Sequence, residues 1–380
     1  MKKIIKKENK KIERQILKGN LAVAALTVIM LAVISVIGLK KVQKEIVLSD
    51  SKIIEEIAED EVANVLKSIL SEMAGVCENL SLNCAEKINK YIEELKICSD
   101  AVRDVYENPD NYGSREIGIP SEELRDKLCL YFSLNKDMDY ESKKNEINKI
   151  GCVWQVFQSV YENSRLNSIY YTTKDGILFS FDENSGEVLD KLEEGQSTLY
   201  LQDYEPREME WYKNSCMDEK GSVRFSGTYL DSTGNLVVTC SQPVYKEDEY
   251  MGVMAIDIYL GNVEDELIGT DDIKYDGFVE IADGSGNVIV SPSLKDNKEK
   301  YRHINILTDE EEGLTELAED MLSGATAIKE FIYKGQESYG VYMPVEYTGW
   351  SIAVVFNTDM VLDDIYERYN YIMEANAATE

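Results

Sequence analysis

The residues between positions 204 and 260 combine aromatic and acidic side chains at spacings that could form a binding pocket. In chain order the stretch contains a Pro-Arg turn ending at Arg207, the aromatic pair Trp211-Tyr212, the segment Tyr229-Leu-Asp231 and Asp257. They fall in a turn, a short helix, a loop and the end of an alternating strand. Aromatic faces and carboxylates that come together from separate strands suit a pocket for a small polar ligand. The alternative is that Trp211 and Tyr229 are ordinary core aromatics.

Catalytic chemistry is poorly represented in the chain. The one histidine, His303, lies in a polar segment. Histidine-based acid–base catalysis, Ser–His or Cys–His nucleophiles and histidine-rich metal sites are therefore disfavoured. The phosphate-binding, dinucleotide, zinc-protease and nucleophile-elbow motifs do not occur either. We expect a protein that is not an enzyme and that carries no cofactor and no metal.

The elements that must position these residues read as an antiparallel α+β unit. Strand-like alternation begins at 168–173, and Lys174-Asp175-Gly176 predicts a hairpin turn into a second strand at 177–181. The segments predicted to follow are a helix at 211–216, strands at 236–239 and 252–257, and a connecting helix at 261–268.

Helical segments are expected before this sheet. Asn108 to Ser114 is a cluster of turn residues. Between 117 and 163 the periodicity favours helices, including one over 121–132 with Ser121 as its N-cap.

A second, smaller unit follows with the same order of elements. A hairpin is predicted around Gly284-Ser285-Gly286, then an acidic helix over 309–322. Three more strands cover 326–333, 338–347 and 350–356, with a final helix over 359–380. The two halves share little sequence, so the repeat is one of architecture.

The N-terminal residues predict a membrane anchor. Residues 21–39 form an uncharged apolar run of nineteen residues, about the length that crosses a hydrocarbon core of roughly 30 Å. Residues 1–20 carry eight Lys and Arg against two Glu, which places the N-terminus in the cytoplasm and residues 40–380 outside it. A cleaved signal peptide is the competing interpretation. The whole chain has a net charge of −31, which disfavours nucleic acid as a partner.

A long helix is predicted to leave the membrane. Apolar residues at spacings of three and four run from Val42 to about Tyr106, and no proline interrupts them before Pro109. A helix of ~65 residues would span ~100 Å, which is more than one domain needs. We therefore expect part of it to form a stalk or to pair with a second copy, giving a homodimer.

Several segments, taken in order and spacing, resemble the double Cache domain. This PAS-like module is the extracytoplasmic ligand-binding part of bacterial chemoreceptors, sensor kinases and related transmembrane receptors. The segments are Tyr204-Glu-Pro-Arg207, Trp211-Tyr212, Tyr229-Leu-Asp231, residues 237–245 and residues 252–258, and Thr348-Gly349-Trp350-Ser351 extends the resemblance into the second unit.

The resemblance implies roles for individual residues. In members that bind amino acids, Tyr, Arg and Trp side chains hold the ligand carboxylate, while a Tyr-x-Asp pair and a strand-end Asp hold its ammonium. By position these are Tyr204, Trp211, Tyr229, Asp231 and Asp257 in this chain. The family's Arg position is occupied by Met209, and Arg207 is the nearest substitute. This departure favours an amine as ligand, with an amino acid second.

The resemblance also implies an overall organisation, which stays an expectation. The divisions would be a cytoplasmic basic tail (1–20), a transmembrane helix (21–39), a stalk and dimerisation helix (40–107), a membrane-distal Cache unit with the ligand pocket (108–270), a membrane-proximal Cache unit (271–358) and a C-terminal helix (359–380). The expected function is extracytoplasmic sensing of a small molecule, with the signal passed by a helix shift to an output outside this chain. The alternative is a stand-alone anchored module that acts through a partner protein.

Overall fold

The computed structural model describes residues 52–377 except 165, 191, 193–199, 202–203, 217, 232–233, 262–272, 292–303 and 309–313. The predicted basic tail, the apolar run 21–39, His303 and most of the predicted helix 261–268 lie outside this part of the chain. Within it, no helix combines the length and the apolar character needed to cross a membrane. Helices and antiparallel strands alternate, which confirms the predicted α+β class.

The described chain divides into two compact units. The seven-stranded unit lies within residues 84–268, and the five-stranded unit comprises described residues of 52–83, 273–291 and 304–377. Helix α2 (Lys52–Glu107) contributes to both. Its buried residues Leu66, Ile69, Leu70 and Met73 follow the predicted spacing of three and four, and it ends before Pro109.

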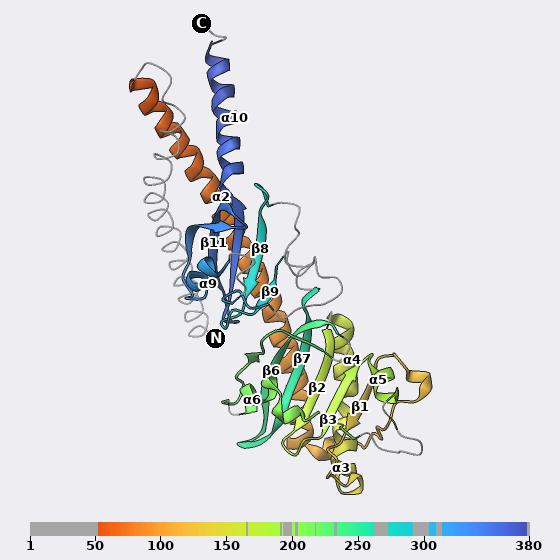
Figure 1. The fold of residues 1–380 in the computed structure, drawn as a ribbon. Helices are drawn as coiled ribbons and strands as arrows, with labels where there is room; N and C mark the ends of the chain where they lie inside the picture. Colours follow the sequence, from red (N-terminus) through yellow and green to blue (C-terminus); the bar gives the residue numbers. More distant parts are fainter. Residues whose placement is uncertain are drawn as a thin grey trace. The chain divides into compact units, whose positions relative to one another are not determined.

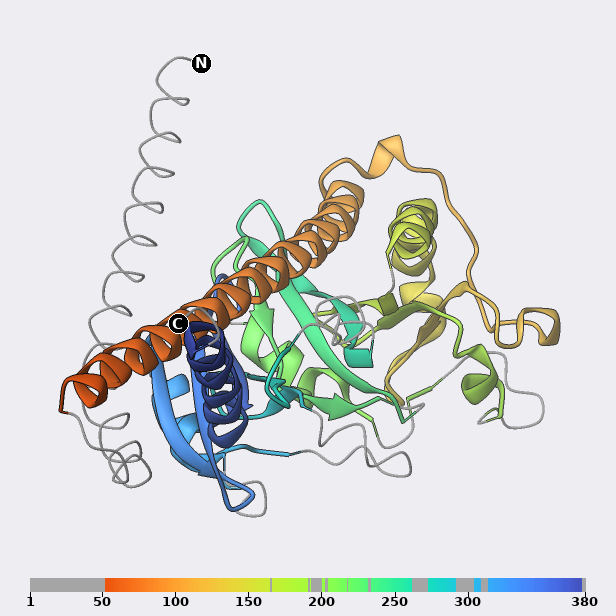
Figure 2. The same ribbon diagram turned by 90° about the horizontal axis from the view of Figure 1, so that it is seen from above.

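The sheet of the seven-stranded unit is antiparallel, and Figures 1 and 2 show its strands side by side. Its order is β1-β3-β2-β7-β6-β4, with β5 paired to β6. The bounds are β1 Cys129–Ser133, β2 Leu166–Thr173, β3 Leu178–Asp182, β4 Arg224–Phe225, β5 Tyr229–Leu230, β6 Leu236–Lys246 and β7 Glu249–Tyr259. The predicted hairpin at residues 174–176 is present, and Gly176 supplies the positive φ of +100° that its turn needs.

Helices cover both faces of this sheet. Besides part of α2, the unit contains α3 (Tyr140–Ile150), α4 (Trp154–Asn163), α5 (Ser185–Asp190) and α6 (Glu210–Cys216). The Tyr171 ring contacts Tyr106 of α2, whereas the next residue back, Tyr170, packs edge-on against Trp211 of α6. Because successive side chains of a strand point to opposite faces, α2 and α6 lie on opposite faces of the sheet.

The helix predicted over 121–132 is wrong. A 3-10 turn covers only Glu122–Leu124, and Asp126 has a positive φ of 54° that ends any helix there. Residues Cys129–Ser133 instead form edge strand β1, paired with β3. Tyr131 and Phe132 are both buried there. Aromatic residues favour strands, and this preference decides the structure here over the helical spacing of the leucines.

The five-stranded unit contains the strands predicted for it. The sheet order is β10-β11-β12-β8-β9, with β8 Phe278–Ala282, β9 Val288–Val290, β10 Ala327–Tyr333, β11 Gln336–Val345 and β12 Trp350–Asn357. Helix α9 (Thr315–Met321) packs on this sheet through Leu317, Ala318 and Met321, and α10 (Thr358–Ala377) follows β12. The predicted acidic helix began at 309, and residues 309–313 are outside the described part.

The two sheets repeat one topology, as predicted. The order β3-β2-β7-β6-β4 in one unit corresponds to β9-β8-β12-β11-β10 in the other. A short helix precedes the edge strand in both, α6 before β4 and α9 before β10. The register agrees as well, since Pro243 pairs with Val253 and Pro344 pairs with Ser351. The repeat is therefore visible at the level of single residues although the sequences have diverged.

Candidate functional site

Strand β7 places Asp257 at the centre of the seven-stranded sheet. Asp257 lies between Thr239 of β6 and Ser168 of β2, which are its partners in register. Tyr170 is two residues after Ser168 and so shares its face of the sheet, the face that α6 covers. The antiparallel pairing thus brings one carboxyl group and three hydroxyl groups to the same place.

The Asp257 carboxyl group accepts four hydrogen bonds from hydroxyl groups. Oδ1 accepts from Tyr170 at 2.6 Å, from Thr239 at 2.7 Å and from Tyr229 at 3.2 Å. Oδ2 accepts from Ser168 at 3.0 Å. We call these five residues the Asp257 network. Asp257 is only 6% exposed, so nearly all of its hydration has been replaced by protein hydroxyls.

The electrostatics of the network favour a cation. Burial raises the pKa of Asp257, and the hydrogen bonds from Tyr170, Thr239, Ser168 and Tyr229 only partly offset this effect. A nearby positive charge would favour the ionised form and reverse the shift. Hydroxyl groups fit the same purpose, because a hydroxyl that donates to Asp257 keeps lone pairs that can accept from an ammonium group. In Thr239 part of this capacity is used within the network, since the Tyr229 hydroxyl is 2.6 Å from its oxygen.

Aromatic rings form one wall beside the network. The ring centroids of Tyr170 and Trp211 are 4.9 Å apart in an edge-to-face arrangement, and Trp211 also packs edge-on against Tyr212 at 5.6 Å. Trp211 is 3% exposed. Met209 is partly buried against this aromatic cluster, so the position where the family resemblance expects Arg is part of an apolar wall.

Tyr204 lies at the more open side of this group. The residue is 40% exposed, yet desolvation and the Asp257 charge raise its pKa to about 12, while a hydrogen bond with Trp211 acts in the opposite direction. These influences place the Tyr204 hydroxyl near both Asp257 and Trp211. The structure therefore brings Tyr204, Trp211, Tyr229 and Asp257 together.

Asp231 directly follows β5, two residues after Tyr229 of the Asp257 network. Its Oδ2 accepts a hydrogen bond from the Asn167 side chain at 2.5 Å, and its Oδ1 accepts from the Asn235 backbone at 2.8 Å. Asn167 directly precedes Ser168, which links the two carboxyl groups through neighbouring residues. The Oδ1 bond lies within the β5–β6 loop, whereas the Oδ2 bond ties this loop to β2.

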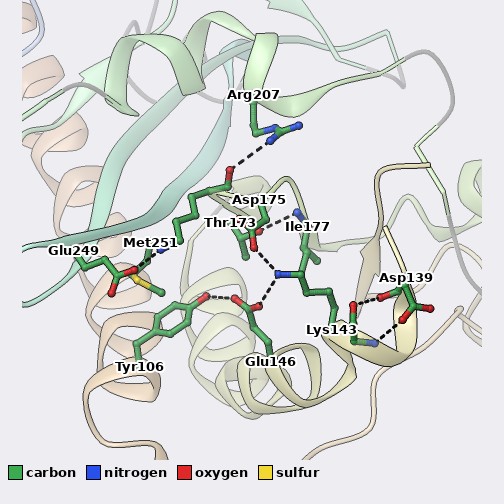
Figure 3. Close-up of polar contacts among 12 residues, drawn as sticks. Tyr106, Asp139, Lys143, Glu146, Thr173, Asp175, Ile177, Arg207, Glu249 and Met251 are labelled. Carbon is green, nitrogen blue, oxygen red and sulfur yellow. Dashed lines mark hydrogen bonds and ion pairs between the residues drawn. The ribbon is translucent and has the colours of Figure 1, made fainter. Parts of the chain in front are cut away.

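The Arg207 side chain lies beside the β2–β3 turn, next to Gly176. Its guanidinium group donates to Glu205 at 2.8 and 2.9 Å and contacts the carbonyl oxygen of Lys174 at 3.5 Å, beside the β2–β3 turn. Figure 3 shows it above the residues of that turn, with a dashed line to the carbonyl oxygen. This pairing raises the pKa of Arg207 and lowers that of Glu205. A role for Arg207 in ligand binding stays a prediction.

Three residues of the network, Ser168, Tyr170 and Thr239, were not identified from the sequence. A usable signal was present, because Ser168 and Tyr170 alternate within a predicted strand and therefore share a face. Thr239 interrupts an apolar strand at the position opposite Asp257. As to metals, the described ranges contain no group of three or more His, Cys, Asp or Glu side chains placed to hold an ion.

Comparison with known proteins adds the family. The Cache domain family (dCache_1) matches residues 39–365. The methyl-accepting chemotaxis protein McpC of Bacillus subtilis is 25% identical over 165 residues, which are 43% of this chain and 22% of that protein. A probable methyl-accepting chemotaxis protein of Bacillus thuringiensis is 24% identical over 235 residues, 55% of this chain and 32% of that protein. The chain thus matches about a fifth to a third of the length of these relatives.

A solved structure with a similar fold is the ligand-binding domain of the Pseudomonas aeruginosa amino acid chemoreceptor PctB in complex with L-Arg. It is 15% identical, covers 77% of this chain and 95% of its own, and has a TM-score of 0.46.

Proposed function

The chain belongs to the Cache domain family of extracytoplasmic sensor domains, and from that premise we propose that it binds a small organic amine at the Asp257 network. An amino acid is the second choice. The carrying observation is the buried Asp257 carboxyl group, which four hydroxyls surround and an aromatic wall borders. A primary ammonium carries three donors, and the hydroxyl oxygens and the carboxylate offer acceptors for them.

The charges around the network support an amine over an amino acid. An amino acid also needs a cationic group for its carboxylate, and the candidate that the sequence offers, Arg207, is paired with Glu205. Met209 contributes an apolar surface at the position where the related pattern has a guanidinium. A ligand with a positive head and an apolar or neutral body fits this combination best.

The wider arrangement is proposed from the sequence. Residues 21–39 anchor the chain in the membrane with residues 40–380 outside the cytoplasm, and α2 pairs with a second copy. Ligand binding changes the helix arrangement only if the ligand binds one arrangement better than the other. The output that reads this change lies outside the 380 residues, and catalysis is not part of the proposed role.

A titration of the full chain in detergent tests the proposal. n-Butylamine, putrescine, alanine and leucine are compared by isothermal titration calorimetry and by the shift of the melting temperature. We expect the amines to bind. We expect Asp257→Asn, which keeps the shape and removes the charge, to weaken amine binding at this site at least tenfold, since a charge-assisted hydrogen bond contributes about 1.5–3 kcal/mol.

The matched control is Asp248→Asn. Asp248 is exposed in the turn of the same β6–β7 hairpin, so it should leave binding unchanged. Equal affinity of the Asp257→Asn variant and the unmodified chain for every amine would contradict the proposed site.

A further inference from the structure

A cavity of about 400 Å³ lies between α2 and α4 of the seven-stranded unit. It is lined by Glu94, Ile97, Gln155, Val156, Ser159, Val160, Asn163 and Ser164. Phe157 of α4 packs against Phe181 of β3, which pairs in register with Ile169 of β2. Since Ile169 alternates with Ser168 and Tyr170, the cavity is on the opposite face of the sheet from the Asp257 network. Its volume is in the range of ordinary small-molecule sites.

Glu94 lines this cavity with an incompletely satisfied carboxyl group. The residue is 8% exposed, and its Oε2 atom is buried without a hydrogen-bond partner among the described residues. Oε1 accepts from the Ser164 hydroxyl, and Lys90 Nζ is 3.6 Å from it. The Lys90 side chain is 55% exposed, so its charge is largely hydrated and compensates Glu94 weakly. A buried acceptor without a donor costs free energy and calls for an explanation.

Helix α4 adds a second, independent preference for positive charge. Its last turn reaches the cavity through Val160 and Asn163, and the last turn contains no basic residue. The carboxyl end of a helix carries partial negative charge, because its last carbonyl groups lack intrahelical partners. Lys90 donates to one of them, the Asn163 carbonyl oxygen, at 3.2 Å. Burial also raises the pKa of Glu94, against the opposing effects of Ser164 and Lys90.

The remaining lining has two characters. Gln155, Ser159, Asn163 and Ser164 supply amide and hydroxyl groups, whereas Ile97, Val156 and Val160 supply an apolar surface. Ile97 is 52% exposed, which leaves a large aliphatic side chain in contact with water at the cavity edge. The cationic head of a ligand would pair with the Glu94 carboxyl group, and a short hydrocarbon chain would cover the aliphatic surface at the cavity edge.

We propose that this cavity is a second binding site, specific for a small organic cation with a primary ammonium head and a short aliphatic body. The ammonium group donates to the Glu94 carboxylate after a side-chain rotation that brings Oε2 to the cavity, and it lies at the C-terminal end of α4. The aliphatic body packs on Ile97 and Val156. The site goes beyond the proposed function, because it shares no residue with the Asp257 network.

The test is calorimetric titration of the full chain with n-butylamine. We expect two binding sites per chain, one lost in Glu94→Gln and the other in Asp257→Asn. Each variant should weaken its own site at least tenfold and leave the other intact, so failure of either proposal is recognised separately. The control Glu93→Gln removes a charge from the adjacent, solvent-facing position of α2 and should retain both sites.

Two further measurements keep the proposal open to refutation. A ligand site predicts that Glu94→Gln melts at the same or a higher temperature without amine, since the unpartnered charge is removed; a lower melting temperature would indicate a structural role and overturn the proposal. Arg165 follows Ser164 in the sequence and is outside the described residues. If the Arg165→Ala variant binds amine at this cavity and the unmodified chain does not, the Arg165 side chain is the cation that neutralises Glu94, and the proposal fails. A single n-butylamine site that is insensitive to Glu94→Gln would overturn it as well.

Discussion

The two units place different chemistry at the same point of one topology. The β2–β3 and β8–β9 hairpins close with the same pair of hydrogen bonds. The backbone N–H groups of Gly176 and Ile177 donate to the carbonyl and side-chain oxygens of Thr173. Those of Gly286 and Asn287 donate to the carbonyl and side-chain oxygens of Asp283. Counting from these turns along the paired strands makes Val355 of β12 the counterpart of Asp257 of β7. Asp257 is flanked by Ser168 and Thr239, whereas Val355 is flanked by Phe278 and Gly340.

The difference shows what each unit uses its covered face for. Around α9 the buried cluster is largely aliphatic, and Leu317 packs closely over Gly340. The buried carboxylate on that face, Glu280, lies on β8 beside Ala353 rather than at the Asp257 position. Around α6 the same position holds the Asp257 network. The backbone therefore accepts a packed core or a polar binding site, and the residues on three central strands decide which.

Exchanging the central residue tests this contrast most severely. Val355→Asp would bury a carboxylate where Phe278 and Gly340 offer no side-chain donors, and Glu280 lies diagonally across on the same face, about 7–8 Å away in such a sheet. We expect a loss of about 4 kcal/mol or more in unfolding free energy at neutral pH, measured by denaturant unfolding. The control Val355→Thr introduces no charge and should cost less. Equal losses in the two variants would show that the charge is not the reason for the apolar residue.

Replacing Met209 by the arginine that the related pattern has at this position tests the same contrast in the seven-stranded unit. Leu314 at the start of α9 and Met209 before α6 both pack into their unit's cluster. Met209→Arg would add a guanidinium beside Trp211, so we expect alanine and leucine to gain about tenfold or more in affinity relative to n-butylamine, in line with about 1.5–3 kcal/mol for a charge-assisted bond. Met209→Gln has similar length without charge and serves as the control. An unchanged preference would mean that Met209 does not face the ligand.

Single hydroxyl deletions rank the members of the Asp257 network. Tyr170 is 7% exposed and donates to the charged Asp257 carboxyl group at 2.6 Å, whereas Tyr229 is less buried, lies 3.2 Å from Asp257 and has its short contact, 2.6 Å, with the neutral Thr239 hydroxyl. We expect Tyr170→Phe to cost about 1.5 kcal/mol of stability and Tyr229→Phe about 0.5 kcal/mol, with weaker amine binding in both. Tyr245→Phe is the control, because its hydroxyl donates to the Asp218 carbonyl oxygen outside the network. The reverse order would show that a short bond to the charged carboxyl group contributes no more stability here than a short bond to a neutral hydroxyl.

The sequence was informative where local patterns decide the structure. Alternation and turn residues located the strands of both units, and the spacing around Trp211 and Asp257 identified the centre of the candidate site. It was misleading at residues 121–132, where helical spacing conflicted with an edge strand that needs β3 as its partner. It also missed Ser168 and Thr239, because a small hydroxyl residue in a strand gains meaning only from the residue opposite it, and register is a property of the folded sheet.

The pH dependence of Asp257 gives the smallest and most specific effect. Burial raises its pKa above the ordinary value of 3.8 in the folded state, so the folded protein binds its proton more tightly than the unfolded chain. The stability contributed by this group is therefore fully present below about pH 3.8 and is lost as the pH rises through the folded pKa. Relative to Asp257→Asn, the unmodified chain should lose stability across that window in melting experiments without ligand.

Amine affinity should change in the opposite direction, increasing as Asp257 ionises, because a cation needs the carboxylate. Both trends should disappear in Asp257→Asn, because asparagine has no titrating group at this position. If ligand-free stability instead increases across the window, Asp257 is held as an ion pair by the chain itself and is not available to a ligand cation.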